Sequence, residues 1–188
     1  EIIRRQVTQL TTLNQTSAAI TSTLDRDRLM DLVLRLLMDN HGFIRMVLIL
    51  LDSERGMATV GQVAGVSPEV ELVVGRLEIP VRDDGGIAAE MLIHGKPVLV
   101  PDIEATAHRI SPVALPLIRR LGLISFVGVP LRSQQRILGY LGADRGPLRC
   151  TQEDADLLMT VASHVAVGLD NARAYSDLEN LTGTLESR

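Results

Sequence analysis

The feature that most constrains this chain is a single helix predicted over residues 151–185. At about 1.5 Å per residue such a helix is ~50 Å long, whereas a small domain is about 30 Å across. The helix must therefore project beyond the domain to which it belongs. Its start, Thr151-Gln152-Glu153-Asp154, resembles a capping box with Asp in place of Glu.

The second half of this helix carries a seam for another helix. The seam residues follow the alternating three- and four-residue spacing of a coiled coil, and they are Asn171, Ala174, Leu178, Leu181 and Leu185. A similar pattern occupies a predicted helix over residues 2–24, at Ile3, Val7, Leu10 and Asn14. Asparagines at two such positions lower stability but fix the register. We therefore expect a parallel homodimer built from the first and last helices.

The region between these helices predicts an α+β domain. A helix should run from the N-cap Asp25 to the C-cap signature Asn40-His41-Gly42. Strands are expected over residues 43–51, 57–64, 76–80, 97–100, 126–132 and 136–144, with a short helix opening at Gly85-Gly86 and a partly helical stretch over 105–121. The order of these elements favours an antiparallel sheet with helices packed on one face.

Composition limits the classes of function. Hydrophobic residues are 46% of the 188, as in a globular protein, while the net charge of −4 and 2% aromatic content argue against nucleic-acid binding. The longest aliphatic run, residues 46–51, is far too short to span a bilayer, so we expect no membrane contact. The single cysteine, Cys150, cannot form an internal disulfide and fits a reducing, cytoplasmic location.

Three motifs in this order resemble a GAF domain. They are GGIAAEMLIHGKPVLVPDIEA at residues 85–105, the hairpin SFVGVPLR and ILGYLGADR at 125–132 and 137–145, and TQEDADLLMTVASHVAVGLDNARAY at 151–175. The resemblance covers residues 25–175 and implies a six-stranded antiparallel sheet, a ligand pocket on one face and a dimer built from terminal helices. Residues 1–24 would then be an N-terminal dimerisation helix, and 176–188 the start of a coiled-coil linker to an effector domain.

The resemblance places the ligand pocket beneath a crossover segment, residues 103–124. Our candidate ligand contacts there are Asp102, His108, Arg109, Ser111 and Ile124. Arg109 suits an anionic ligand because its planar guanidinium matches a carboxylate or phosphate. His108 is the candidate axial ligand if the pocket takes heme. A cyclic nucleotide is a further alternative, although the Asn-Lys/Asp motif of that GAF class is not found here.

The sequence shows no catalytic arrangement. It has no Ser/His/Asp set, no metal cluster and no phosphate-binding glycine loop, and members of this fold that reduce free methionine sulfoxide need several cysteines. We therefore expect no enzymatic activity, no metal and no required cofactor. The resemblance implies a regulatory sensor that binds a small molecule and signals through a helical homodimer to an effector, such as the histidine kinase of a two-component system or a cyclase. The alternatives are a dimerisation spacer without a ligand and a heme-binding gas or redox sensor.

Overall fold

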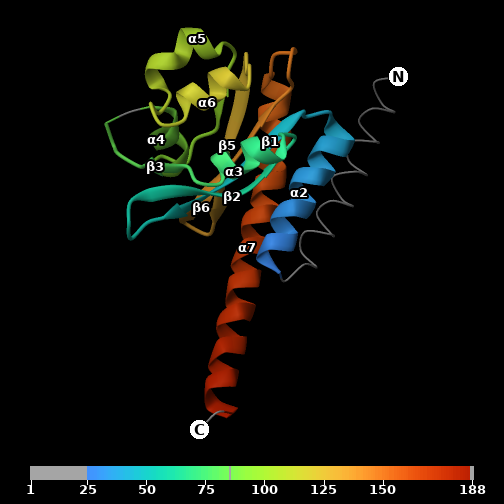
Figure 1. The fold of residues 1–188 in the computed structure, drawn as a ribbon. Helices are drawn as coiled ribbons and strands as arrows, with labels where there is room; N and C mark the ends of the chain where they lie inside the picture. Colours follow the sequence, from blue (N-terminus) through green and yellow to red (C-terminus); the bar gives the residue numbers. More distant parts are fainter. Residues whose placement is uncertain (1–24, 85, 187–188) are drawn as a thin grey trace.

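The computed structural model describes residues 25–84 and 86–186, and its centre is a six-stranded antiparallel sheet (Figure 1). The strands are β1 (Arg45–Asp52), β2 (Met57–Ala64), β3 (Glu78–Pro80), β4 (Val98–Val100), β5 (Phe126–Ser133) and β6 (Arg136–Asp144). Their order across the sheet is β3-β2-β1-β6-β5-β4. The predicted α+β class and six-stranded sheet are confirmed. The helix expected over 2–24, with Ile3, Val7, Leu10 and Asn14, lies outside the described residues.

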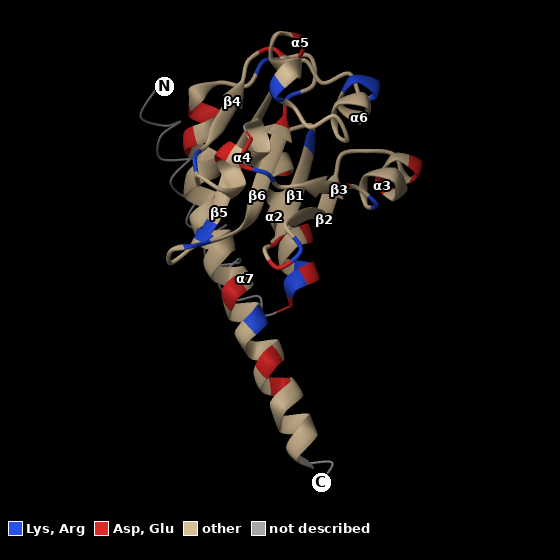
Figure 2. Ribbon diagram, turned by 90° about the vertical axis from the view of Figure 1, so that its left-hand side faces the viewer, with Lys and Arg blue, Asp and Glu red and all other residues tan. Residues whose placement is uncertain are grey.

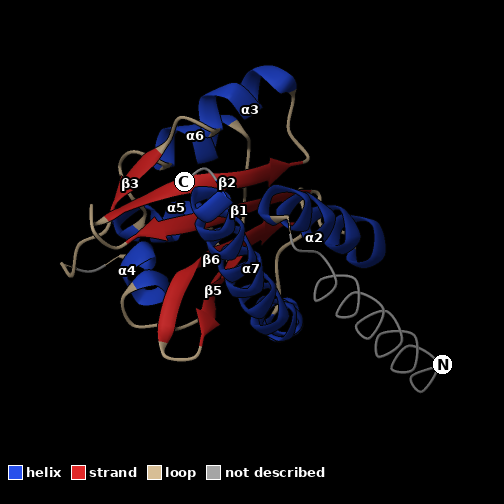
Figure 3. Cartoon of the chain, turned by 90° about the horizontal axis from the view of Figure 1, so that it is seen from below, coloured by secondary structure: helices blue, strands red, loops and turns tan. Residues whose placement is uncertain are grey.

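The two faces of the sheet are covered differently. Helices α2 (Arg26–His41) and α7 (Gln152–Glu186) lie together on one face (Figure 3). The other face is covered by short elements, namely α3 (Pro68–Val74), α4 (Ile87–Leu92), α5 (Ile103–Thr106), the 3-10 helix η1 (Ala107–Arg109) and α6 (Leu115–Arg120). The far half of α7 extends past the sheet, as the sequence predicts (Figure 1, Figure 2).

Both long helices begin at the caps that the sequence indicates. The Asp25 carboxylate accepts a hydrogen bond from the Arg28 backbone N–H, and Gly42 ends α2 in the left-handed conformation at φ 72°. At α7 the Thr151 backbone N–H donates to the Asp154 carboxylate at 2.9 Å, and the Asp154 N–H donates to the Thr151 hydroxyl at 3.4 Å. The Thr-x-x-Asp capping box is therefore confirmed.

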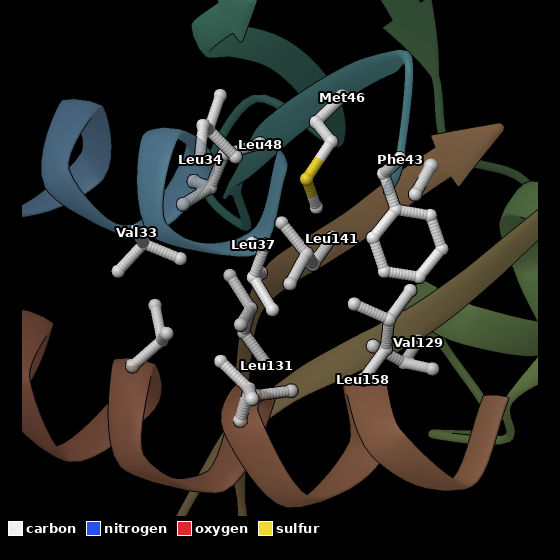
Figure 4. Packing of buried hydrophobic residues seen from close by; sticks show 14 of the residues in the cluster. Val33, Leu34, Leu37, Phe43, Met46, Leu48, Val129, Leu131, Leu141 and Leu158 are labelled. Atoms are coloured by element: carbon white, nitrogen blue, oxygen red, sulfur yellow. The ribbon is translucent and has the colours of Figure 1, made fainter. Parts of the chain in front are cut away.

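The main hydrophobic core lies between the sheet and the two long helices (Figure 4). Alternate residues of the central strands point to this face and are fully buried, because successive side chains in a strand point to opposite sides. Leu48, Val129 and Leu141 of the sheet meet Leu37 of α2 and Leu158 of α7. This packing fixes the first half of α7 to the domain.

Local structure departs from expectation mainly in the short elements. Residues 65–75, between two of the predicted strands, contain the two-turn helix α3, because Ser67 caps the Val70 N–H and Pro68 occupies its first position. Strand β3 spans only Glu78–Pro80, and β1 begins at Arg45 rather than at residue 43. At the start of α4, Gly86 has φ 91°, and a Cβ there would lie 2.9 Å from the Arg109 carbonyl oxygen. Glycine is needed at this turn.

Candidate functional site

An apolar pocket of about 150 Å³ lies between the sheet and the short helices, on the face opposite α2 and α7. Its floor is formed by side chains of β1, β2 and β6, and its walls by α3, α6 and the segment after α6. The lining includes Val47, Ile49, Val60, Val63, Val74, Ile79, Leu117, Ile118, Leu121, Leu123, Phe126, Tyr140 and Gly142. Native interiors leave few voids larger than a water molecule, so a hollow of this size marks the site as a candidate for a ligand.

Gly142 keeps part of the floor open. A Cβ at this position would lie 3.2 Å from the Cγ1 atom of Val47 and 3.6 Å from the Cε2 atom of Tyr140. The first of these distances is tighter than ordinary van der Waals contact. The glycine therefore lets the Tyr140 ring lie beside the backbone of its own strand.

The charged groups at the edge of the pocket neutralise each other. Arg45 binds Asp144 through two hydrogen bonds, Nε to Oδ1 at 2.9 Å and Nη2 to Oδ2 at 2.7 Å, and this bonding raises the pKa of Arg45. The remaining Arg45 nitrogen, Nη1, donates to the Leu121 carbonyl oxygen at 2.6 Å. Arg45 thus ties the end of α6 to the sheet, and the pocket offers a ligand no uncompensated charge.

Tyr140 supplies the remaining polar side chain of the lining. Burial raises the pKa of its phenol to about 12, so the hydroxyl stays protonated at physiological pH. In the described part of the chain this hydroxyl makes no hydrogen bond, although every fully buried polar side-chain atom there has a partner. The hydroxyl of this lining residue is therefore not fully enclosed, and no other described group occupies it.

Arg145, next to Asp144 in the chain, binds on the opposite side of the sheet. Its Nη2 donates to Asp154 Oδ1 at 2.6 Å and its Nη1 to the His41 carbonyl oxygen at 2.8 Å, while the guanidinium lies 4.5 Å from the centre of the Phe43 ring. Burial would raise the pKa of Asp154, but hydrogen bonds from Arg145 and Thr151 outweigh it and lower that pKa. Arg145 thereby joins the end of α2 to the start of α7.

None of the five candidate ligand contacts lines this apolar pocket, and three of them lie together elsewhere. His108, Arg109 and Ser111 line a separate, more polar depression of about 430 Å³ beside α4. The Arg109 guanidinium there is already paired with Glu90 of α4, and the His108 side chain is exposed. An exposed histidine away from the apolar pocket does not fit the axial ligand of a buried heme.

The other two candidates, Asp102 and Ile124, line neither of these hollows. Asp102 caps α5 by accepting from the Ala105 N–H at 3.0 Å, and that bond is the main cause of its lowered pKa. Ile124 is 40% exposed, and its carbonyl accepts from the Ile103 N–H. Our sequence reasoning missed the strand residues of the floor, such as Val47, Val60 and Gly142. The period-two alternation of the strands was the signal for them, but the pairing of strands was needed to place them together.

The described seam residues of α7 are all exposed in the single chain. Leu178 and Leu181 are each 63% exposed and Leu185 is 75% exposed, on the half of α7 that leaves the sheet. Val167, which our sequence reasoning missed, precedes Asn171 by four residues and is 46% exposed. It extends the same spacing toward the domain. A row of apolar side chains in water is unusual unless another surface covers it.

Other chemistry finds little support among the described residues. They hold no group of three or more acidic, histidine or cysteine side chains that could bind a metal, and none of their helices combines the length and apolar character needed to cross a bilayer. Cys150 is buried, and burial raises the pKa of its thiol, which makes it a poor nucleophile.

Comparison with solved structures shows the same fold in bacterial proteins. The GAF domain of a phosphoenolpyruvate-protein phosphotransferase from Coxiella burnetii matches with a TM-score of 0.74 at 19% identity, covering 91% of this chain and 98% of that one. Residues 122 to 287 of a methyl-accepting chemotaxis protein match with a TM-score of 0.72 at 19% identity, over 85% and 98% of the two chains. A free methionine-R-sulfoxide reductase from Neisseria meningitidis, in complex with its substrate, matches with a TM-score of 0.69 at 20% identity, over 89% and 91%.

Sequence comparison identifies the family. No curated protein matches the chain. The profile of the GAF domain family matches residues 25–169, which begins at the cap of α2 and ends within α7. The chain therefore belongs to the GAF domain family, a family of regulatory sensor domains found in signalling proteins.

Proposed function

We propose that this domain is a cytoplasmic sensor module in which a small molecule in the apolar pocket changes the position of α6 and, through the sheet, of α7. A homodimer formed along the α7 seam would carry the change to an effector domain, such as a histidine kinase or a cyclase. A methyl-accepting chemotaxis protein and a GAF domain/HD domain protein among the structural neighbours support a signalling context. The domain itself acts by binding rather than by catalysis.

The observation that carries this proposal is the adjacency of Asp144 and Arg145. Asp144 holds Arg45, which holds the end of α6 beside the pocket. Arg145 holds the start of α7 and the end of α2 on the other face. A shift of α6 that moves the Arg45–Asp144 pair therefore acts on the residue that positions the output helix. A ligand changes this equilibrium only to the extent that it binds the two arrangements with different affinity.

The exposed seam supports the dimer. Leu178, Leu181 and Leu185 continue the spacing that starts at Asn171, beyond the part of α7 that the sheet covers. In a parallel pair these leucines would be buried between two helices, and Asn171 would fix their register.

The experiment that tests the proposal fills the pocket with a larger side chain in place of a ligand. Val60→Phe places a ring in the hollow, and Leu72→Phe on the 67%-exposed surface of α3 is the matched control. Hydrogen exchange of the wild-type chain and both variants is then compared by mass spectrometry. We expect Val60→Phe to change exchange in α6 and also in the first turns of α7, while Leu72→Phe changes neither.

The main competing function is a dimerisation spacer that binds nothing. A spacer predicts that the Val60→Phe effect stays within β2 and the short helices that wall the pocket. Unchanged exchange at residues 152–160, in a folded variant with altered exchange at α6, would reject the sensor mechanism.

A further inference from the structure

We propose that the pocket takes an uncharged, mainly apolar molecule about the size of one aromatic ring, held by a single hydrogen bond to the Tyr140 hydroxyl. A monophenol is the simplest molecule with these properties. This inference rests on the proposed function, because it names the ligand class of the same pocket.

Size is the first argument. The hollow measures about 150 Å³ between the sheet and α6. Apolar cavities of roughly this volume stay dry and accept benzene or xenon. A purine nucleotide and a porphyrin are both larger than this hollow, so a single ring matches its size better than either.

Charge is the second argument. Of the described side chains that line the pocket, only Arg45 and Asp144 are charged, and two hydrogen bonds join them in an ion pair. The third bonding direction of Arg45 is taken by the Leu121 carbonyl. An anionic ligand would have to break this pair and leave Asp144, only 1% exposed, without an opposite charge and bonded only by the Gly146 backbone N–H. Burying a charge without a partner is costly, so the pocket selects against ions.

The Tyr140 hydroxyl is the third argument. Tyr140 belongs to the apolar lining, and its hydroxyl makes no hydrogen bond within the described chain and is not fully enclosed. A phenolic oxygen in the pocket could accept from it or donate to it, whereas toluene could do neither. The structure therefore predicts a preference for phenol over toluene that depends on Tyr140.

The test measures binding of phenol, toluene, benzoate, cyclic AMP and hemin to the purified chain, by ligand-observed NMR and by the shift in thermal unfolding. We expect phenol to bind more tightly than toluene by about two- to tenfold, the range of one net hydrogen bond. Tyr140→Phe should abolish this preference while keeping toluene binding. Val60→Phe should block both neutral ligands, and Leu72→Phe, the exposed control, should block neither.

Each other outcome is decisive. Tighter binding of benzoate, cyclic AMP or hemin than of phenol would overturn the ligand class and leave the sensor function standing. A phenol preference that persists in Tyr140→Phe would overturn the role of Tyr140. If no probe binds, the ligand class fails, and if Val60→Phe also leaves α7 unchanged in hydrogen exchange, the sensor function fails with it.

Discussion

At the scale of single residues, the cross-strand pair of Arg45 and Asp144 combines two functions. It neutralises the edge of the pocket, and it attaches α6 to the sheet through the Leu121 carbonyl. Both side chains are largely buried, with 18% and 2% of their surface exposed. Removing one member leaves the other without compensation in a poorly solvated place.

We predict that Arg45→Met lowers the free energy of unfolding by about 3 kcal/mol, because the buried Asp144 carboxylate loses both hydrogen bonds from Arg45 and its opposite charge. Urea denaturation followed by circular dichroism measures the loss. Arg55→Met is the matched control, since the Arg55–Glu78 pair is about half exposed on both sides and should contribute less than about 1 kcal/mol. Equal losses in the two variants would contradict this account of the buried pair.

The Arg145–Asp154 pair predicts a pH dependence. The pKa of Asp154 is lower in the folded chain than in an unfolded one, so its stabilising contribution is present above its unfolded pKa and is lost as the pH falls through its folded pKa. Asp154→Asn should therefore be less stable than the wild type at pH 7 and should lose less stability on acidification below about pH 4. Urea denaturation at a series of pH values measures both effects.

Asp156→Asn, on the exposed side of the same helical turn, is the control for this prediction. It should follow the wild-type pH profile. Parallel profiles of Asp154→Asn and the wild type would show that the Arg145 pair does not lower the pKa of Asp154 in solution.

The residues of the pocket show where sequence reasoning stops. Arg45 and Asp144 are 99 residues apart and meet only because β1 pairs with β6. Val60 faces the hollow because β2 pairs with β1 in a register that shifts between Leu48 and Ile49. Alternation within one strand predicts two faces, but it does not say which strands are neighbours or where a register shift falls. The sequence therefore predicts ligand contacts only from the crossover segment and not from the strands that form the floor of the pocket.

At the scale of elements, the sequence predicts best what local chemistry decides. The caps at Asp25, Gly42 and Thr151 fix the ends of α2 and the start of α7 through contacts within a few residues. The formation of short helices such as α5 and α6 depends on how they pack against the rest of the domain. Their six residues or fewer carry too little periodicity to be predicted from the sequence alone.

The seam of α7 makes a prediction about assembly. The double variant Leu178→Asp, Leu181→Asp should shift the homodimer toward monomer, because buried unpaired carboxylates oppose helix pairing. Analytical ultracentrifugation at roughly tens of micromolar protein measures the shift. This concentration lies well above the dissociation constant expected of a stable dimer. A wild-type chain that sediments as a monomer under these conditions would reject the dimer.

The matched control introduces the same number of carboxylates at positions of α7 outside the seam. Ser176→Asp with Asn180→Asp adds two carboxylates to exposed positions on the same stretch of α7. This variant should remain dimeric. Dissociation by both double variants would point to general charge repulsion rather than to a defined seam.

At the scale of the whole molecule, the two faces of the sheet should differ in stability. The face toward α2 and α7 holds the main core, whereas the segment from 103 to 124 contributes only Ile103 and Ile110 as buried apolar side chains. We predict that amides of residues 103–124 exchange on the order of tenfold faster, or more, than those of β5 and β6. Hydrogen exchange of the free chain measures this difference. Equal protection of the two regions would mean that the pocket is closed by a rigid cover.

The unsupported half of α7 turns small movements into large ones. The helix packs on the domain as far as the buried Ala172, and residues 173–186 extend roughly 20 Å beyond that support. A rigid rod that tilts by about 5° at its base moves its tip by about 2 Å over this length. A change too small to disturb the close-packed core can therefore displace the tip of α7 by more than it moves the base. In the proposed sensor function the long helix is a lever arm, and its length sets how far its tip moves for a given tilt at its base.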